Sequence, residues 1–290
     1  MNRLPSWTTD NQHSTPSPFH SGVPYSSGGP IVGASFGEAS SEETANCHQQ
    51  RRSFPHFVYS PVHYEANYAY PLVVWLHGRS GDERQITRVM PDLSTRNYIA
   101  AAPRGNVTVK SEPTQLGQPS HVGNSASGFD WVDSNRGAEQ ALERVLDSVA
   151  SAKAQLNVAA DRIFLAGYQS GGTMATRIAL RYPELFAGVA NIGGTFPEGD
   201  QPLQNLDAAR RHQLLMMYGE KSPIYGADDV CADLPLFHAA GLKIMMRQYP
   251  GDGELTTQML RDLDVWIMER VTGQVTESAP TEPGTTGHWN

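Results

Sequence analysis

The chain has 290 residues, a formal net charge of −8 and only two cysteines, Cys47 and Cys231. This length suits one α/β domain with a well-buried core and additional tails. The acidic charge is mixed and has no basic clusters, which argues against a nucleic-acid partner, and so few cysteines predict neither a disulfide framework nor a zinc site. No apolar run is long enough to span a bilayer, and the N-terminal residues lack the apolar core of a signal peptide, so we expect a cytoplasmic protein.

The chain divides by composition into two polar tails and a patterned middle. Residues 1–50 are rich in Ser, Pro and Gly and have no hydrophobic period, so we expect a disordered tail, and residues 274–290 are expected to be a second one. A single domain is therefore predicted for residues 51–273. The expected strands cover residues 54–60, 70–78, 98–103, 163–166, 185–192, 214–218 and 242–249. The first expected helix begins after residue 83. The other expected helices cover residues 136–156, 173–183, 228–240 and 255–271.

This alternation of strands and helices predicts a mostly parallel sheet with helices on both faces and a site at the C-terminal ends of the strands. The apolar run Tyr70–Gly78 is typical of a central strand. Between Arg104 and Trp131 we expect a long loop without regular structure, which is either a lid or substrate wall or a solvated insertion. No metal or cofactor is predicted. The chain has two pairs of neighbouring methionines, which we interpret as core packing rather than as a metal-binding cluster; they are Met216, Met217, Met245 and Met246.

The segment Arg162–Met174 carries the strongest local signal. It predicts a strand at 163–166, a glycine-rich corner at 167–172 and a helix from about Thr173. A strand that turns this sharply into a helix is the setting of the nucleophile elbow, Gly-x-Ser-x-Gly. When Gly167 and Gly171 are taken as the two glycines of that pattern, Gln169 occupies the nucleophile position. A neutral amide cannot attack an ester.

At this point the sequence resembles the phospholipase/carboxylesterase family of the α/β-hydrolase superfamily, which includes bacterial carboxylesterases and acyl-protein thioesterases. The resemblance extends over about residues 54–271. It implies an α/β-hydrolase fold formed by a single domain with a mostly parallel central sheet. The motifs that carry it are Pro-Leu-Val-Val-Trp-Leu-His-Gly at 71–78, Ala-Ala-Pro-Arg-Gly at 101–105, Ile-Phe-Leu-Ala-Gly-Tyr-Gln-Ser-Gly-Gly-Thr-Met-Ala at 163–175 and Tyr-Pro-Gly-Asp-Gly-Glu-Leu at 249–255.

The resemblance also assigns the positions of a Ser-Asp-His triad, and all of them are substituted here. The serine position falls on Gln169, the acid on Ser222 and the histidine on Gly253. The oxyanion hole is implied to remain, with backbone N–H donors at Arg79 and Ser170. His77 and Gly78 precede the first donor and are implied to support this loop.

A shift of the elbow by one residue would make Ser170 the nucleophile. A serine hydroxyl needs a neighbouring imidazole, and in this fold the histidine comes last in the chain. None of the downstream histidines fits; they are His212 before a strand, His238 inside a helix and His288 in the tail. We interpret His77 as a hydrogen-bonding support for the oxyanion loop rather than as a base.

These residues predict a catalytically degenerate member of the family that keeps a pocket for a small-molecule ester or acyl ligand. The first alternative is a weak carboxylic-ester hydrolase with Ser170 as its nucleophile. A second alternative is a scaffold whose N-terminal tail binds partners. The sequence predicts no cofactor and leaves the oligomeric state open.

Overall fold

The computed structural model describes residues 53–110 and 127–273, so the expectations for residues 1–50 and 274–290 lie outside the described part. The strands are β1 His56–Tyr59, β2 Tyr70–Leu76, β3 Ile99–Pro103, β4 Val107–Lys110, β5 Ser127–Asp130, β6 Val158–Tyr168, β7 Gly188–Ile192, β8 Gln213–Gly219 and β9 Lys243–Tyr249. The helices are α1 Ile86–Leu93, α2 Asn135–Gln155, α3 Ser170–Arg181, α4 Leu206–Ala209, α5 Ala227–Ala240 and α6 Thr257–Thr272. Single turns of 3₁₀ helix occur at Glu83–Gln85 and Pro183–Leu185.

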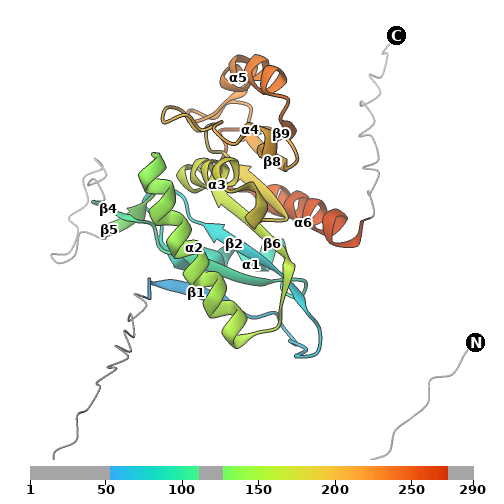
Figure 1. Cartoon of the computed structure of the whole chain (residues 1–290). Helices are drawn as coiled ribbons and strands as arrows, with labels where there is room; N and C mark the ends of the chain where they lie inside the picture. The colour runs from blue at the N-terminus through green and yellow to red at the C-terminus, as the bar shows by residue number, and fades with distance from the viewer. Residues whose placement is uncertain (1–52, 111–126, 274–290) are drawn as a thin grey trace, which may run out of the picture. The chain divides into compact units, whose positions relative to one another are not determined.

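A seven-stranded sheet in the order β1-β3-β2-β6-β7-β8-β9 organises the described residues (Figure 1). Strand β1 pairs antiparallel with β3, and every other neighbouring pair in this sheet is parallel. Parallel strands end at the same edge, so the loops that follow β2, β6, β7, β8 and β9 gather there. This arrangement confirms the predicted mostly parallel α/β architecture, to which β1 adds an antiparallel edge strand.

The two faces of the sheet are covered by different helices, because successive side chains of a strand point to opposite faces. All seven residues of β2 are buried. Leu72, Val74 and Leu76 belong to one hydrophobic cluster with the inward residues of α2 and α3. Val73 and Trp75 pack into the other cluster, which α1 and α6 cover. The apolar run that predicted a central strand is therefore explained by burial on both faces.

Helix boundaries follow ordinary capping chemistry. The Ser134 hydroxyl accepts a hydrogen bond from the Gly137 N–H at the start of α2, and Thr256 caps α6 through the Met259 N–H. Helix α5 ends at Gly241, whose φ of 66° is left-handed. Within residues 53–110 and 127–273, no helix is long and apolar enough to cross a membrane.

The segment between Arg104 and Trp131 was expected to have no regular structure, and this expectation is wrong at both ends. Strands β4 and β5 pair antiparallel, with Val107 opposite Asp130. The Phe129 N–H also bonds the carbonyl of Gly81. A Cβ atom at Gly128 would lie 2.2 Å from the carbonyl oxygen of Ser80, so only glycine allows this close approach. The pairing joins residues distant in sequence, which local composition does not reveal.

Two smaller expectations also need correction. Helix α3 begins at Ser170 instead of near Thr173, because the chain enters the helix directly from the corner residue Gln169. Met216 and Met217 are buried as predicted, whereas Met245 is 40% exposed because β9 is the edge strand of the sheet.

Candidate functional site

The turn from β6 into α3 is the centre of the candidate site. Its corner residue, Gln169, has φ 48° and ψ −119°, a conformation that costs a side-chain-bearing residue about 1–3 kcal/mol. Neighbouring backbone groups hold it there. The Gln169 N–H donates to the Ile192 carbonyl (2.8 Å), and its own carbonyl accepts from the Thr173 N–H (3.0 Å). This strained strand-to-helix turn has the geometry of a nucleophile elbow.

Steric contacts fix which residue occupies the corner. A Cβ atom at Gly167 would lie 2.2 Å from the carbonyl oxygen of Gly171. A Cβ atom at Gly171 would lie 2.3 Å from the carbonyl oxygen of Leu76 in the central strand. Both positions therefore require glycine, and the residue midway between them is Gln169. The one-residue shift that would bring Ser170 to the corner does not occur.

The Gln169 side chain is tied to the loop after β9 through a tyrosine. Its Nε2 donates to the hydroxyl oxygen of Tyr168 (3.2 Å), and that hydroxyl donates to the carbonyl oxygen of Gly253 (3.3 Å). Burial raises the pKa of Tyr168, so the phenol stays protonated and keeps its donor role. Nothing in the sequence singles out Tyr168, because a tyrosine at the end of a strand carries no signal of a link to a distant loop.

The remaining two predicted positions lie against each other. A Cβ atom at Gly253 would lie 2.9 Å from Oγ of Ser222, and Gly253 has a left-handed φ of 85°. The Ser222 hydroxyl accepts hydrogen bonds from the N–H groups of Ile224 and Tyr225, each 3.3 Å long. The structure thus brings Gln169, Ser222 and Gly253 together at one edge of the sheet.

Ser170 is the first residue of α3, and its Oγ atom is buried without a hydrogen-bond partner in the described residues. No imidazole of the described residues contacts it. His212 directly precedes β8, at the opposite edge of the sheet, and His238 lies on α5, as predicted. His288 lies outside the described residues.

The two predicted oxyanion-hole donors have no hydrogen-bond acceptor within residues 53–110 and 127–273. In the described part of the chain, neither the Ser170 N–H nor the Arg79 N–H donates a hydrogen bond to another backbone group or side chain. The Ser170 N–H is one of the unpaired donors at the positive end of the α3 dipole. The Arg79 side chain is 74% exposed and faces Asp130 at 3.7 Å, so it is a surface arginine. Such N–H groups can donate hydrogen bonds to a carbonyl or carboxylate oxygen.

His77 forms hydrogen bonds with both of its ring nitrogens beside the loop that carries Arg79. The Gly105 N–H can only donate, so the Nε2 atom of His77, 2.9 Å away, accepts and the proton resides on Nδ1, which donates to the Gly78 carbonyl (2.8 Å). The His77 carbonyl accepts from the indole N–H of Trp131 (2.9 Å). Burial lowers the pKa of His77 below its ordinary value, which favours this neutral form. With both nitrogens engaged, His77 is not available as a base.

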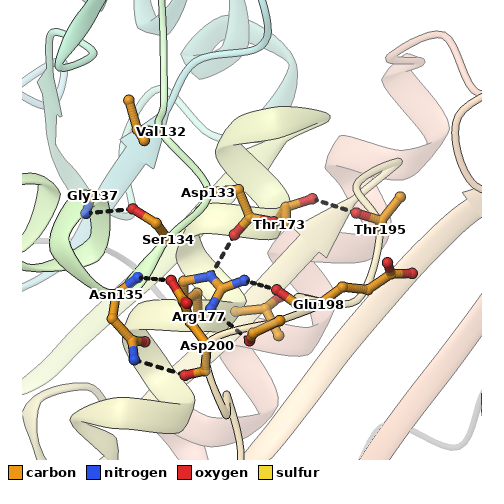
Figure 2. Close-up of polar contacts among 12 residues, drawn as sticks. Val132, Asp133, Ser134, Asn135, Gly137, Thr173, Arg177, Thr195, Glu198 and Asp200 are labelled. Carbon is orange, nitrogen blue, oxygen red and sulfur yellow. Dashed lines mark hydrogen bonds and ion pairs between the residues drawn. The ribbon is translucent and has the colours of Figure 1, made fainter.

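A buried arginine on α3 was not predicted from the sequence. Arg177 is 1% exposed and donates to the Asp133 carboxylate and to the carbonyl oxygens of Glu198 and Gly199 (Figure 2). The signal that could have revealed it is a charged residue among the apolar residues of this helix, one turn after the inward Met174. Figure 2 also shows Thr173 facing Thr195, with the two hydroxyl oxygens 3.2 Å apart. Among the described residues, no group of His, Cys, Asp and Glu side chains could hold a metal ion.

Comparisons with known proteins agree with this fold. A family model described as esterase PHB depolymerase matches residues 56–216. A carboxylesterase from Bacillus cereus superposes with a TM-score of 0.54 at 15% identity, over 77% of this chain and 97% of that one. FphF, a fluorophosphonate-binding serine hydrolase from Staphylococcus aureus, superposes with a TM-score of 0.52 at 16% identity, over 73% of this chain and 91% of that one.

A curated relative is similar over a shorter segment. "Putative esterase NocK" of Nocardia uniformis subsp. tsuyamanensis is 32% identical over 78 residues, which are 26% of this chain and 22% of that protein. The match therefore spans about a fifth of the length of that relative. At these identities the solved structures support the fold alone, and they confirm the predicted α/β-hydrolase fold.

Proposed function

Because the chain belongs to the esterase PHB depolymerase family, within the carboxylesterase-like α/β-hydrolases, we propose that it binds an ester or acyl compound without hydrolysing it. The bound carbonyl oxygen is received by the backbone N–H groups of Arg79 and Ser170. In this proposal the elbow contributes to ligand binding and does not supply a nucleophile.

The observation that carries the proposal is the identity of the residue at the strained corner. Gln169 offers an amide there, and amide nitrogen is not a nucleophile because its lone pair is delocalised into the carbonyl. Its Nε2 already donates to the Tyr168 hydroxyl. The residue can hold a ligand by hydrogen bonding but cannot form an acyl intermediate.

The surroundings of the corner also argue against hydrolysis. Gly253 has no side chain to act as a base, and Ser222 uses its hydroxyl to accept backbone N–H groups. In a well-studied serine protease, loss of the serine or the histidine costs on the order of a millionfold in rate. The oxyanion hole and binding alone retain roughly a thousandfold over water. We therefore expect turnover near the background of an ordinary ester assay.

Retained binding is supported by the free donors. The N–H of Ser170 lies at the N-terminus of a helix, where partial positive charge favours an oxygen with negative character. The Arg79 N–H belongs to a loop that buried His77 anchors on both sides. Donors fixed in this way need little rearrangement when they bind an ester, amide or carboxylate oxygen.

The catalytic half of the proposal is tested by fluorophosphonate labelling and by hydrolysis of p-nitrophenyl butyrate. We expect the wild type to match Ser170→Ala and the no-enzyme background in both assays. The competing hypothesis, a weak ester hydrolase with Ser170 as nucleophile, requires that the wild type labels and that Ser170→Ala does not. That result would refute the loss of catalysis.

The binding half is tested by titrating the ¹⁵N-labelled protein with butyramide, which presents a carbonyl oxygen and is not an ester. The amide resonances of Arg79 and Ser170 should move together and saturate. The amide resonance of Lys243 on the edge strand serves as the control and should stay in place. Unchanged Arg79 and Ser170 resonances would show that the donors bind no carbonyl compound of this class.

A further inference from the structure

A concave region lies at the loop after β7, next to α5. It is a cavity of about 560 Å³, a volume in the range that takes small organic ligands. Its apolar wall comes mainly from Phe196, Pro202, Leu203 and Leu236. Phe196 is buried and stacks edge-on against Phe237 of α5, with 4.9 Å between the ring centroids. The loop and the helix thus form one packed wall.

This wall is held in place by the buried arginine of α3. Arg177 donates to the carbonyls of Glu198 and Gly199, both lining residues, and pairs with Asp133 just before α2. The next residue, Asp200, accepts from the backbone N–H of Asn135 (3.0 Å), as Figure 2 shows. The loop is therefore fixed to the start of α2 and to the second half of α3 before any ligand arrives, which lowers the entropic cost of binding.

The charges of the lining select the kind of ligand. Glu198 and Asp233 line the cavity, and its lining includes no lysine or arginine. The Asp233 carboxylate is oriented by the hydroxyl of buried Tyr225, which donates to Oδ2 at 2.9 Å. An oriented carboxylate beside an apolar wall favours a cation and repels an anion.

We propose that this cavity binds an organic cation with an apolar body, of the alkylammonium class. The apolar body lies against Phe196, Leu203 and Leu236, and the ammonium group faces Asp233. This site takes a different ligand chemistry from the elbow, where N–H donors receive a carbonyl oxygen. It does not depend on the function proposed above.

The test compares three probes that share an eight-carbon chain and differ in charge: octyltrimethylammonium, octanol and octanoate. Calorimetric titration of the full chain should give the tightest binding for the ammonium and the weakest for octanoate. Asp233→Asn keeps the shape of the side chain and removes its charge, so it should weaken ammonium binding about tenfold while octanol binding stays unchanged. Leu236→Arg, at a 43% exposed position, should weaken ammonium binding more strongly because it places a like charge in the wall.

The matched control is Asp228→Asn, which removes the same charge from α5 at an exposed position outside the lining. It should leave ammonium binding as in the wild type. The proposal is overturned if octanoate binds as tightly as the ammonium probe, if the two asparagine variants behave alike, or if the ammonium probe does not bind. The elbow test reads the Arg79 and Ser170 amides with butyramide, so failure of either proposal leaves the other intact.

Discussion

Replacing Arg177 by methionine keeps most of the length and apolar volume of the side chain and removes its charge and its donors. The buried guanidinium is bonded to the Asp133 carboxylate and to two loop carbonyls. Removing one partner of a fully buried ion pair costs about 3–5 kcal/mol. The Asp133 side chain is 42% exposed and can regain water, so we expect the lower end, about 3 kcal/mol. This corresponds to a fall in Tm of roughly 6–12 °C for a domain of this size.

The matched control is Arg181→Met, one turn later on the same helix. Arg181 is 26% exposed and pairs with Glu139, which is 51% exposed, so this pair should contribute no more than about 1 kcal/mol. Urea denaturation followed by circular dichroism gives both unfolding free energies. If the two variants lie within about 1 kcal/mol of each other, the role assigned to Arg177 in fixing the loop is wrong.

Two further predictions concern the candidate site. Burial holds the pKa of His77 below its ordinary 6.5, so below that pH the unfolded chain takes up a proton that the folded chain does not, and the unfolding free energy should decrease as pH falls from about 7.5 to 5.5. Urea titrations should show a smaller decrease for His77→Gln and an intermediate one for His212→Gln, whose histidine is buried less deeply; a wild-type slope in His77→Gln would contradict this. Gly253→Ala and Gly251→Ala both place a side chain at positive φ (85° and 97°), but only the side chain at 253 meets Ser222. Gly253→Ala should therefore be the more destabilising by about 1 kcal/mol in thermal melts. Equal losses of stability would mean that the contact with Ser222 is not restrictive.

Most of the fold could be predicted because its signals are local. Continuous apolar runs located the central strands, such as Tyr70–Leu76, and helical spacing located α2 and α6. The predictions that failed concern contacts between residues that are distant in sequence. The strands β4 and β5 pair while Gly128 approaches Ser80 closely, and the exposure of Met245 follows from the edge position of β9. Neither contact has a signature in the residues around it.

The candidate site depends on contacts that the sequence does not display. The family resemblance assigned Gln169, Ser222 and Gly253 to one site, and these residues lie at one edge of the sheet. The resemblance gave no sign that Tyr168 links the corner to Gly253 or that Gly253 has a left-handed φ. That φ has a practical result, because a histidine placed at 253 would be strained and would crowd Ser222. Substituting all three positions at once is therefore not expected to rebuild a working base.

The corner at Gln169 also bears on how such a site gains or loses chemistry. Its unusual backbone is imposed by Gly167, Gly171 and the carbonyl of Ile192, and none of these contacts involves the side chain at 169. Different side chains at position 169 are therefore compatible with the same backbone conformation of the corner. Structure and reactivity at this position are therefore separable. A chain of this fold can gain or lose a nucleophile by one substitution here while these backbone contacts stay in place.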